Sequence, residues 1–468
     1  MPIIPNIGEI LKITSNYLID NIIYSFIGNN IYLSDLVKYK NIDFYIKPFI
    51  FTKLIIDKIS DSICLENNII LLKQIFNKFR YIEFILDSRH NNDIKNYIKL
   101  ISYCNNLTHL TFENKFNKEL FDSLKELKNL THLFFGRCPN QKLGDSLKEL
   151  KNLTHFTFGT SFNKKLGDSL KELKNLTHLT FGFYFNQNLG DSLKELKNLT
   201  HLQLGWSFNQ RLEDSLKELK KLNHLDFEDS FNQKLEDSLK ELKNLTHLNF
   251  GNNFNQKLKD SLKELKNLTH LNFRLKFNQK LGDSLKELKN LTHLTFGIKF
   301  NQNLDDSLKE LKNLTHLTFG TYFNQNLGDS LKELNNLTHL IFGTYFNQNL
   351  GDSLTELKNL THLTFGENFN QNINILKELQ NLTYIEFGSA FNQFHNFISL
   401  IKLKKLSYIS LGCYIDDCFI YELKQLKNLT HLYFNNEINE INGYNYIDLL
   451  QEDVVYNDQL VYFKYQYN

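Results

Sequence analysis

The chain has 468 residues, with 54 Lys and Arg against 52 Asp and Glu, and a formal net charge of +2. The two signs alternate along the chain, as in Lys148-Glu149-Leu150-Lys151, so no basic stripe predicts nucleic-acid binding. The five cysteines lack the paired spacing of zinc or redox motifs. Residues 1–11 show no basic segment followed by an apolar run, and nowhere do about eighteen apolar residues occur together. We therefore expect a cytoplasmic protein with no cofactor, metal or membrane partner.

Residues 1–45 are rich in isoleucine, with apolar side chains at roughly helical spacing, which predicts a small helical segment. The stretch 18–37 resembles a degenerate F-box, the module that docks onto a Skp-type adaptor in cullin ubiquitin ligases. Leu18-Ile19 stands where that motif usually has Leu-Pro. The alternative is a helical cap over the first repeat. The resemblance implies adaptor contacts by Leu18, Ile22, Ile23, Phe26, Leu33 and Leu36.

Residues 46–100 predict divergent leading repeats or a linker, and a regular repeat follows. Its clearest mark is a histidine that recurs every 23 residues. A fixed period of this length is typical of a solenoid, in which each unit buries its apolar side against its neighbours. The histidines stand at 109, 132, 155, 178, 201, 224, 247, 270, 293, 316, 339 and 362.

One repeat, residues 143–163, spaces its apolar residues first by three and then by two. This predicts a short helix or 3-10 turn followed by a strand, and Ser146 with Glu149 predicts a capping box at the start of the helical part. The pattern resembles a leucine-rich repeat. The Phe-Asn pair after the strand makes it similar to the FNIP-type repeat, found in giant viruses and social amoebae, for about fifteen units over residues 101–435.

That resemblance implies an α/β solenoid with a concave parallel sheet, short helical or 3-10 outer segments, and protein binding as its role. The phenylalanines of the Phe-Asn pairs are expected to stack as an aromatic spine. The asparagine beside each one can bridge backbone groups of adjacent turns, because its amide both donates and accepts hydrogen bonds. This predicted structural ladder comprises Asn117, Asn163, Asn186, Asn209, Asn232, Asn255 and Asn278.

Strand alternation places His132 and Phe134 on the face opposite Leu133 and Phe135, so the histidines should form a column on the concave sheet. Neutral imidazoles can stack there, whereas charged ones repel below about pH 6. We expect acid to loosen the solenoid. A zinc site is not expected, because no thiol or carboxylate accompanies the histidines at a regular spacing.

Two zones vary from repeat to repeat, namely the outward strand position and the two residues just after the strand. Exposed aromatic residues at such positions are typical of contact hot spots, although neutral drift explains the variation equally well. If a protein partner binds the concave face or the turn edge, the best candidates are Trp206, Phe183, Tyr184, Gln203, Asp226, Tyr322 and Tyr345.

Catalysis is not expected, because Ser146 and His155 should lie on opposite sides of the repeat and no catalytic motif is present. Residues 436–468 predict a C-terminal cap or tail. The favoured function is a non-enzymatic protein-interaction solenoid. It would select the target of an SCF-type ubiquitin ligase if the F-box works, in the host-cell cytoplasm if the protein is viral. The alternative is a standalone scaffold, and a histidine-based metal or pH sensor remains a third possibility.

Overall fold

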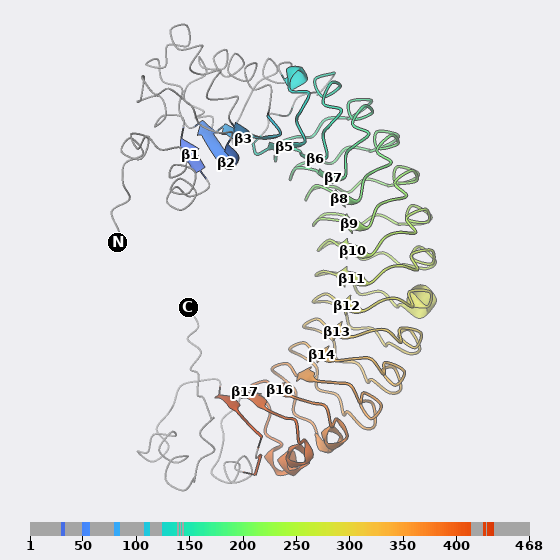
Figure 1. The fold of residues 1–468 in the computed structure, drawn as a ribbon. Coiled ribbons are helices and arrows are strands. Elements are labelled where there is room, and N and C mark those ends of the chain that lie inside the picture. Colours follow the sequence, from blue (N-terminus) through green and yellow to red (C-terminus); the bar gives the residue numbers. More distant parts are fainter. Residues whose placement is uncertain are drawn as a thin grey trace, which may run out of the picture. The chain divides into compact units, whose positions relative to one another are not determined.

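The computed structural model describes residues 107–112, 124–137, 140, 142, 145–412, 425–426 and 428–434, and the backbone of three earlier strands within residues 30–84 (Figure 1). The chain forms two compact units, unit 1 of residues 1–228 and unit 2 of residues 229–468. The six F-box-like residues, Asn117, the five cysteines and the tail 436–468 lie outside the described residues. Within residues 1–45, where helix was expected, Asn30–Tyr32 form a strand.

Unit 1 carries nine described strands, each of which pairs in parallel with the next along the chain. One described 3-10 turn, η2 (Leu124–Glu126), lies between β4 and β5. The strands are β1 (Asn30–Tyr32), β2 (Phe49–Ile56), β3 (Phe79–Phe84), β4 (His109–Phe112), β5 (His132–Phe135), β6 (His155–Thr157), β7 (His178–Thr180), β8 (His201–Gln203) and β9 (His224–Asp226).

Unit 2 repeats this arrangement with nine further parallel strands. Its described 3-10 turns are η3 (Gly282–Leu285), η4 (Asn374–Glu378) and η5 (Phe394–Lys402). The strands are β10 (His247–Phe250), β11 (His270–Phe273), β12 (His293–Thr295), β13 (His316–Thr318), β14 (His339–Ile341), β15 (His362–Thr364), β16 (Tyr384–Phe387), β17 (Tyr408–Leu411) and β18 (His431–Phe434).

In both units the strands lie along one side and the turns along the other (Figure 1). Between them lies a core to which every repeat contributes the same positions; in one repeat these include Leu173, Leu176, Leu179 and Phe185, each at most 1% exposed. Burying one such side chain contributes roughly 1.5 to 3 kcal/mol. The predicted fold class, a parallel solenoid of the leucine-rich-repeat kind with 3-10 outer turns, is confirmed.

The outer segments are successive three-residue turns, as in Lys171 N–H to Asp168 O, Leu173 N–H to Leu170 O and Leu176 N–H to Leu173 O. The predicted capping box is wrong in η3, the matching element of a later repeat. There the equivalent serine, Ser284, lies inside the turn, and the N-cap Leu281 makes no side-chain hydrogen bond. A 3-10 turn this short begins on the apolar residue that anchors it in the core, so the serine comes too late to cap it.

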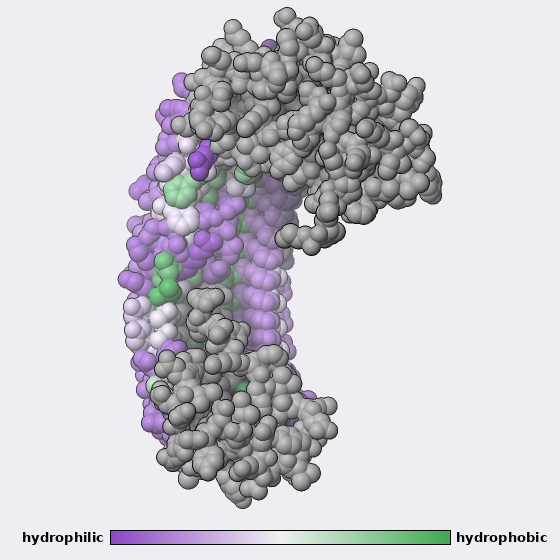
Figure 2. Space-filling view, turned by 90° about the vertical axis from the view of Figure 1, so that its left-hand side faces the viewer, coloured by the Kyte–Doolittle hydropathy of each residue, from purple (hydrophilic) through white to green (hydrophobic). Residues whose placement is uncertain are grey.

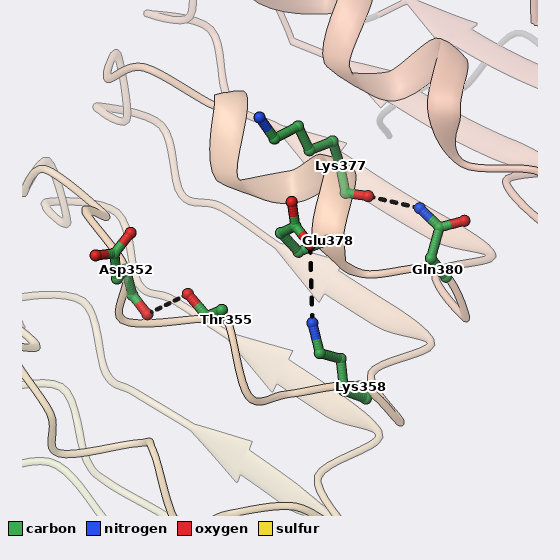
Figure 3. Close-up of polar contacts among 6 residues, drawn as sticks. All are labelled: Asp352, Thr355, Lys358, Lys377, Glu378 and Gln380. Carbon is green, nitrogen blue, oxygen red and sulfur yellow. Dashed lines mark hydrogen bonds and ion pairs between the residues drawn. The ribbon is translucent and has the colours of Figure 1, made fainter.

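Figure 3 shows polar contacts within and between two successive outer segments of unit 2. The Thr355 hydroxyl donates to Asp352 O at 2.7 Å, and the Lys358 ammonium lies 3.9 Å from the Glu378 carboxylate of the next repeat. The side chains of that ion pair are 53% and 43% exposed. Exposed pairs of this kind contribute at most about 1 kcal/mol, so the outer charges serve solubility more than stability.

The Phe-Asn pairs tie each repeat to the next. Phe162 and Phe185 are buried and stack with ring centroids 6.0 Å apart. Asn163 Oδ1 accepts the backbone N–H of Asn186 and the side-chain amide N–H of Gln187, both at 2.9 Å. In unit 2, Asn301 Oδ1 accepts the same two bonds from the following repeat. The asparagine thus acts through its acceptor oxygen.

Replacing Asn301 with Ala is expected to lower the free energy of unfolding by about 1 to 3 kcal/mol, because a half-buried backbone N–H and an amide lose their acceptor. Asn301→Asp keeps two acceptor oxygens and should retain most of that stability. Chemical denaturation of the two variants measures the difference. Equal losses would show that the acceptor oxygen is not what matters.

Nine described repeats place a left-handed residue at the start of the outer turn or just before it. Gly190, Gly282, Gly328 and Gly351 have φ between +47° and +51°, and a Cβ added at Gly328 would meet nothing within 4 Å. At the same position of another repeat Asp305 has φ +44°. The left-handed conformation strains any residue with a Cβ, so the four repeats with a non-glycine residue here store that strain.

We expect Gly328→Ala to lower the free energy of unfolding by about 1 kcal/mol through backbone strain alone, since its Cβ makes no clash. The reciprocal change, Asp305→Gly, should leave stability unchanged or raise it. Thermal unfolding of both variants beside the parent tests the pair, and a destabilised Asp305→Gly would contradict the argument.

Candidate protein-binding face

We call the side of the strands that carries the histidines the strand face. A typical repeat places three features on it: the histidine at the start of the strand, the outward residue two positions later, and a two-residue turn after the strand, which we call the turn edge. In β7 the burial pattern is half-buried His178, buried Leu179 and half-buried Thr180. The histidine column was predicted for this face, and it lies there.

The histidine rings are stacked. In unit 1 the centroids of neighbouring rings from His109 to His224 are 3.9 to 4.2 Å apart, with interplanar angles of 11° to 14°. In unit 2 the rings from His247 to His362 are 4.2 Å apart, at 9° to 12°. Tyr384 and Tyr408 continue the stack with centroids 4.3 Å apart. The column from β4 to β17 therefore consists of aromatic rings, and tyrosine can take the position that histidine occupies in most repeats.

The hydrogen bonds around each ring define its tautomer. The Thr154 hydroxyl donates its single proton to Thr131 O at 3.0 Å, and its oxygen lies 2.9 Å from His155 Nδ1. That oxygen can only accept from the ring, so Nδ1 carries the proton. The same pair of bonds recurs in other repeats, for example at Thr315 and His316. In the neutral ring Nε2 then carries a lone pair.

Burial, together with repulsion from His155 and His201, lowers the pKa of His178 to about 4. The pKa values of His270 and His339 are lowered to about 4 for the same reasons. The stacked rings are nearly parallel, so the Nε2 lone pairs of neighbours do not converge on one ion. In the part of the chain that the structure describes, no group of three His, Cys, Asp or Glu side chains could hold a metal ion.

Unit 1 brings three of the sequence-predicted residues together at its turn edge. Phe183 stacks on Trp206 with centroids 5.3 Å apart, and Tyr184 meets Phe183 edge-on at 4.9 Å. These three side chains are 40% to 57% exposed. The predicted Gln203 and Asp226 face each other on the neighbouring strands β8 and β9. Gln203 also donates to the Glu228 carboxylate at 2.6 Å.

Unit 2 holds a groove of about 840 Å³ along the strand face, which extends over the strands β11 to β17. Its floor is made of outward strand residues, such as Thr295, Thr318 and Ile341, and of the glycine that follows each of the strands β12 to β17. A Cβ at Gly320 would lie 1.9 Å from Gly297 O, and one at Gly343 would lie 2.1 Å from Gly320 O. Contact between the backbones of neighbouring repeats therefore requires glycine at these positions. Because glycine has no side chain, nothing at these positions fills the groove.

The wall of this groove at the turn edge contains Leu275 and Ile298, each 38% exposed. Beside this wall, Tyr322 and Tyr345 stack with centroids 5.1 Å apart and are 47% and 44% exposed. Figure 2, which looks toward the strands, shows hydrophobic side chains set in a mainly hydrophilic surface. The two tyrosines were predicted from the sequence but Leu275 and Ile298 were not, although an apolar residue at a solvated turn position is a signal that the sequence contains.

Three charged lining residues were also missed, namely Arg274, Glu367 and Glu386. Each departs from the residue that most neighbouring repeats carry at the same position, which was the available signal. Ser146 and His155 lie on opposite sides of the repeat, as the spacing predicted: Ser146 is in an outer turn, whereas His155 is on β6 of the strand face. Among the described residues no helix is long and apolar enough to cross a membrane.

Neither a protein-family model nor a curated protein sequence matches the chain. Solved structures do. CroV588, a circular leucine-rich-repeat protein of the giant virus CroV, is 30% identical with a TM-score of 0.64, over 79% of this chain and 52% of its own. The Leptospira interrogans leucine-rich-repeat protein LIC12759 is 20% identical with a TM-score of 0.58, over 79% and 93%. A chain of the Drosophila Toll–Spatzle complex is 13% identical with a TM-score of 0.57, over 83% and 62%.

The chain thus spans about half the length of CroV588. The repeat geometry and these three likenesses define it as a leucine-rich-repeat solenoid. The resemblance to the FNIP-type repeat stays a prediction.

The lowered histidine pKa values give a pH dependence with a definite sign. In the unfolded chain the histidines have a pKa near 6.5 and bind protons as the pH falls below that value. In the folded column they stay neutral until about pH 4. Stability is thus full above pH 6.5 and is lost as the pH falls toward 4. Protonation adds a proton at Nε2 and leaves the threonine bond intact, so the loss comes from repulsion and burial of charge.

We expect the thermal midpoint to fall between pH 6.5 and 4. A variant with His270, His293 and His316 changed to Tyr should lose less over this range, because Tyr384 and Tyr408 show that tyrosine stacks in the column. A midpoint that stays flat from about pH 7 to 5 in the parent would contradict the argument.

Proposed function

We propose that the chain is a non-enzymatic scaffold that binds a protein partner along its strand face. The observation that carries this proposal is the groove over β11 to β17, which is open to solvent and lined by the positions that vary between repeats. The core positions stay nearly constant while these surface positions change, so the differences between repeats gather where a partner would touch.

Two further observations support the proposal. The exposed stack of Phe183 and Trp206 in unit 1 offers rigid aromatic surface, the kind of side chain that is enriched at interface hot spots. In addition, the Toll–Spatzle structure, which shares this fold, is a complex of proteins. That likeness supports protein binding in general and does not identify a partner.

The test is a set of quantitative pull-downs with matched variants. Ile341→Arg adds bulk and charge to the groove floor, whereas Ile341→Thr restores the residue that β12, β13 and β15 carry there. Glu310→Ala changes an outer turn only. We expect specific partners to be lost from Ile341→Arg and from Trp206→Ala, depending on which unit they use. The parent, Ile341→Thr and Glu310→Ala should retain them.

If all of these variants captured the same proteins in the same amounts, binding along the strand face would be refuted. Ile341 is 39% exposed, so its replacement should not disturb the core. Circular dichroism of each variant checks that it folds.

We propose as a finer alternative that residues 18–37 recruit a Skp-type adaptor and a cullin, which would make the chain a ubiquitin-ligase substrate receptor. This rests on the sequence resemblance of that stretch alone. The experiment is a pull-down with the full chain and with a chain lacking residues 1–45. Recovery of adaptor and cullin with the full chain only would support the receptor, and their absence from both would leave a standalone scaffold.

A further inference from the structure

The groove of unit 2 carries opposite charges at its two ends. Arg274 lines it beside β11, at a position where the following repeats have Gly297 and Gly320. Glu386 lies on β16, where β15 has Thr364 in register with it. Glu367 takes the turn-edge position that Thr321 and Thr344 occupy in the two preceding repeats. Three departures from a nearly identical repeat therefore place a cation at one end and two carboxylates at the other.

The carboxylate end is fixed in place. Glu386 accepts a hydrogen bond from the Tyr384 hydroxyl at 2.9 Å. Glu367 accepts from the Ser389 hydroxyl at 2.6 Å and from the Ser389 N–H at 3.3 Å. These bonds hold both carboxylates in place at the groove, so a cation could pair with them without ordering two flexible side chains first.

The middle of the groove is uncharged. Between its two ends the lining consists of threonine, glycine, phenylalanine and isoleucine, and the only other titratable lining groups are Tyr384 and Tyr408. Ile341 on the floor and Ile298 on the wall are 39% and 38% exposed. A charged group lying over this stretch would lose water without gaining a partner, which disfavours charge at the centre of any occupant.

The separation of the charges sets the length of the occupant. From β11 to β16 there are five strand steps in register, which at about 4.8 Å each give roughly 24 Å. An extended chain advances about 3.3 Å per residue, so about seven residues cover that distance. The outward threonine hydroxyls of β12, β13 and β15 can bond the unpaired backbone groups of an extended chain, whereas a helix has already paired its own.

We propose that this groove binds an extended segment of a protein partner with an acidic side chain over Arg274, an uncharged middle, and a basic side chain about seven residues away over Glu367 and Glu386. The inference rests on the proposed protein-binding function and specifies the chemistry of the partner. The segment is recognised by the order of its charges, and its net charge can be zero.

The test uses the full chain and two labelled peptides of about nine residues, a length matched to the charge separation. The polarised peptide has two glutamates at one end, five alternating serines and valines, and two lysines at the other. The shuffled peptide has the same composition, with one glutamate and one lysine at each end. Fluorescence anisotropy should show the polarised peptide binding at least about tenfold more tightly, an advantage that shrinks as salt is added.

Three variants restore the ordinary residue of the repeat and so should fold: Arg274→Gly, Glu367→Thr and Glu386→Thr. Arg274→Gly and the double change at Glu367 and Glu386 should each remove most of the preference for the polarised peptide. Asp305→Gly removes a charge that lies outside the groove lining and should leave the preference intact. Equal affinity for the two peptides, or no binding of the polarised peptide up to about 1 mM, would overturn the inference.

Failure of the charge-order inference can be told apart from failure of the proposed protein-binding function. If pull-downs still lose partners with Ile341→Arg while the two peptides bind alike, the strand face binds proteins but does not read charge order. If the two peptides bind alike and neither Ile341→Arg nor Trp206→Ala changes the captured proteins, both proposals fail.

Discussion

The main-chain register between neighbouring repeats is the constraint on which the rest of the structure depends. The Thr154 carbonyl accepts three hydrogen bonds from the next repeat, from Thr177 N–H at 2.8 Å, His178 N–H at 2.9 Å and the Thr177 hydroxyl at 3.0 Å. This junction aligns β6 with β7 residue for residue. Each side chain therefore lies beside its own equivalent, and every surface of the solenoid is a set of columns of like residues.

Stacking like on like restricts which residues each column can contain. Leucine, phenylalanine, asparagine and threonine gain from such contacts, because they pack or exchange hydrogen bonds without repulsion. Lysine and glutamate recur as often, but they occupy the outer turns, where water screens them. Histidine is the intermediate case: it is tolerated on the strand face because the column keeps it neutral and the threonine fixes its tautomer. Charged residues such as Arg274 and Glu386 occur on the strand face where no like charge follows in the same column.

The sequence alone predicted the period, the strands that begin at the histidines, the face on which those histidines lie and the core. These follow from spacing, because burial recurs with the repeat. The failures were local. The capping box required a helix with a free first turn, but the segment around Ser284 is a 3-10 turn anchored on Leu281. The groove was missed because it depends on the close approach of Gly320 to Gly297 O, a contact between residues of different repeats that spacing does not reveal. The sequence did not show which aromatic candidates contact one another. In the structure Phe183 stacks on Trp206, and Tyr322 stacks on Tyr345.

Near-identical repeats leave the folding chain with a problem of alignment. Any strand from His155 to His339 could pair with the wrong neighbour after a shift of one whole repeat, and almost every contact would be reproduced. The spacing changes near the C-terminal end, with 22 residues from His362 to Tyr384 and 24 from Tyr384 to Tyr408. In the structure these strands still pair in register, and the long η5 turn takes up the one additional residue between β16 and β17. A shifted chain would meet these two intervals out of step, so the irregular repeats act as markers that select one alignment from many.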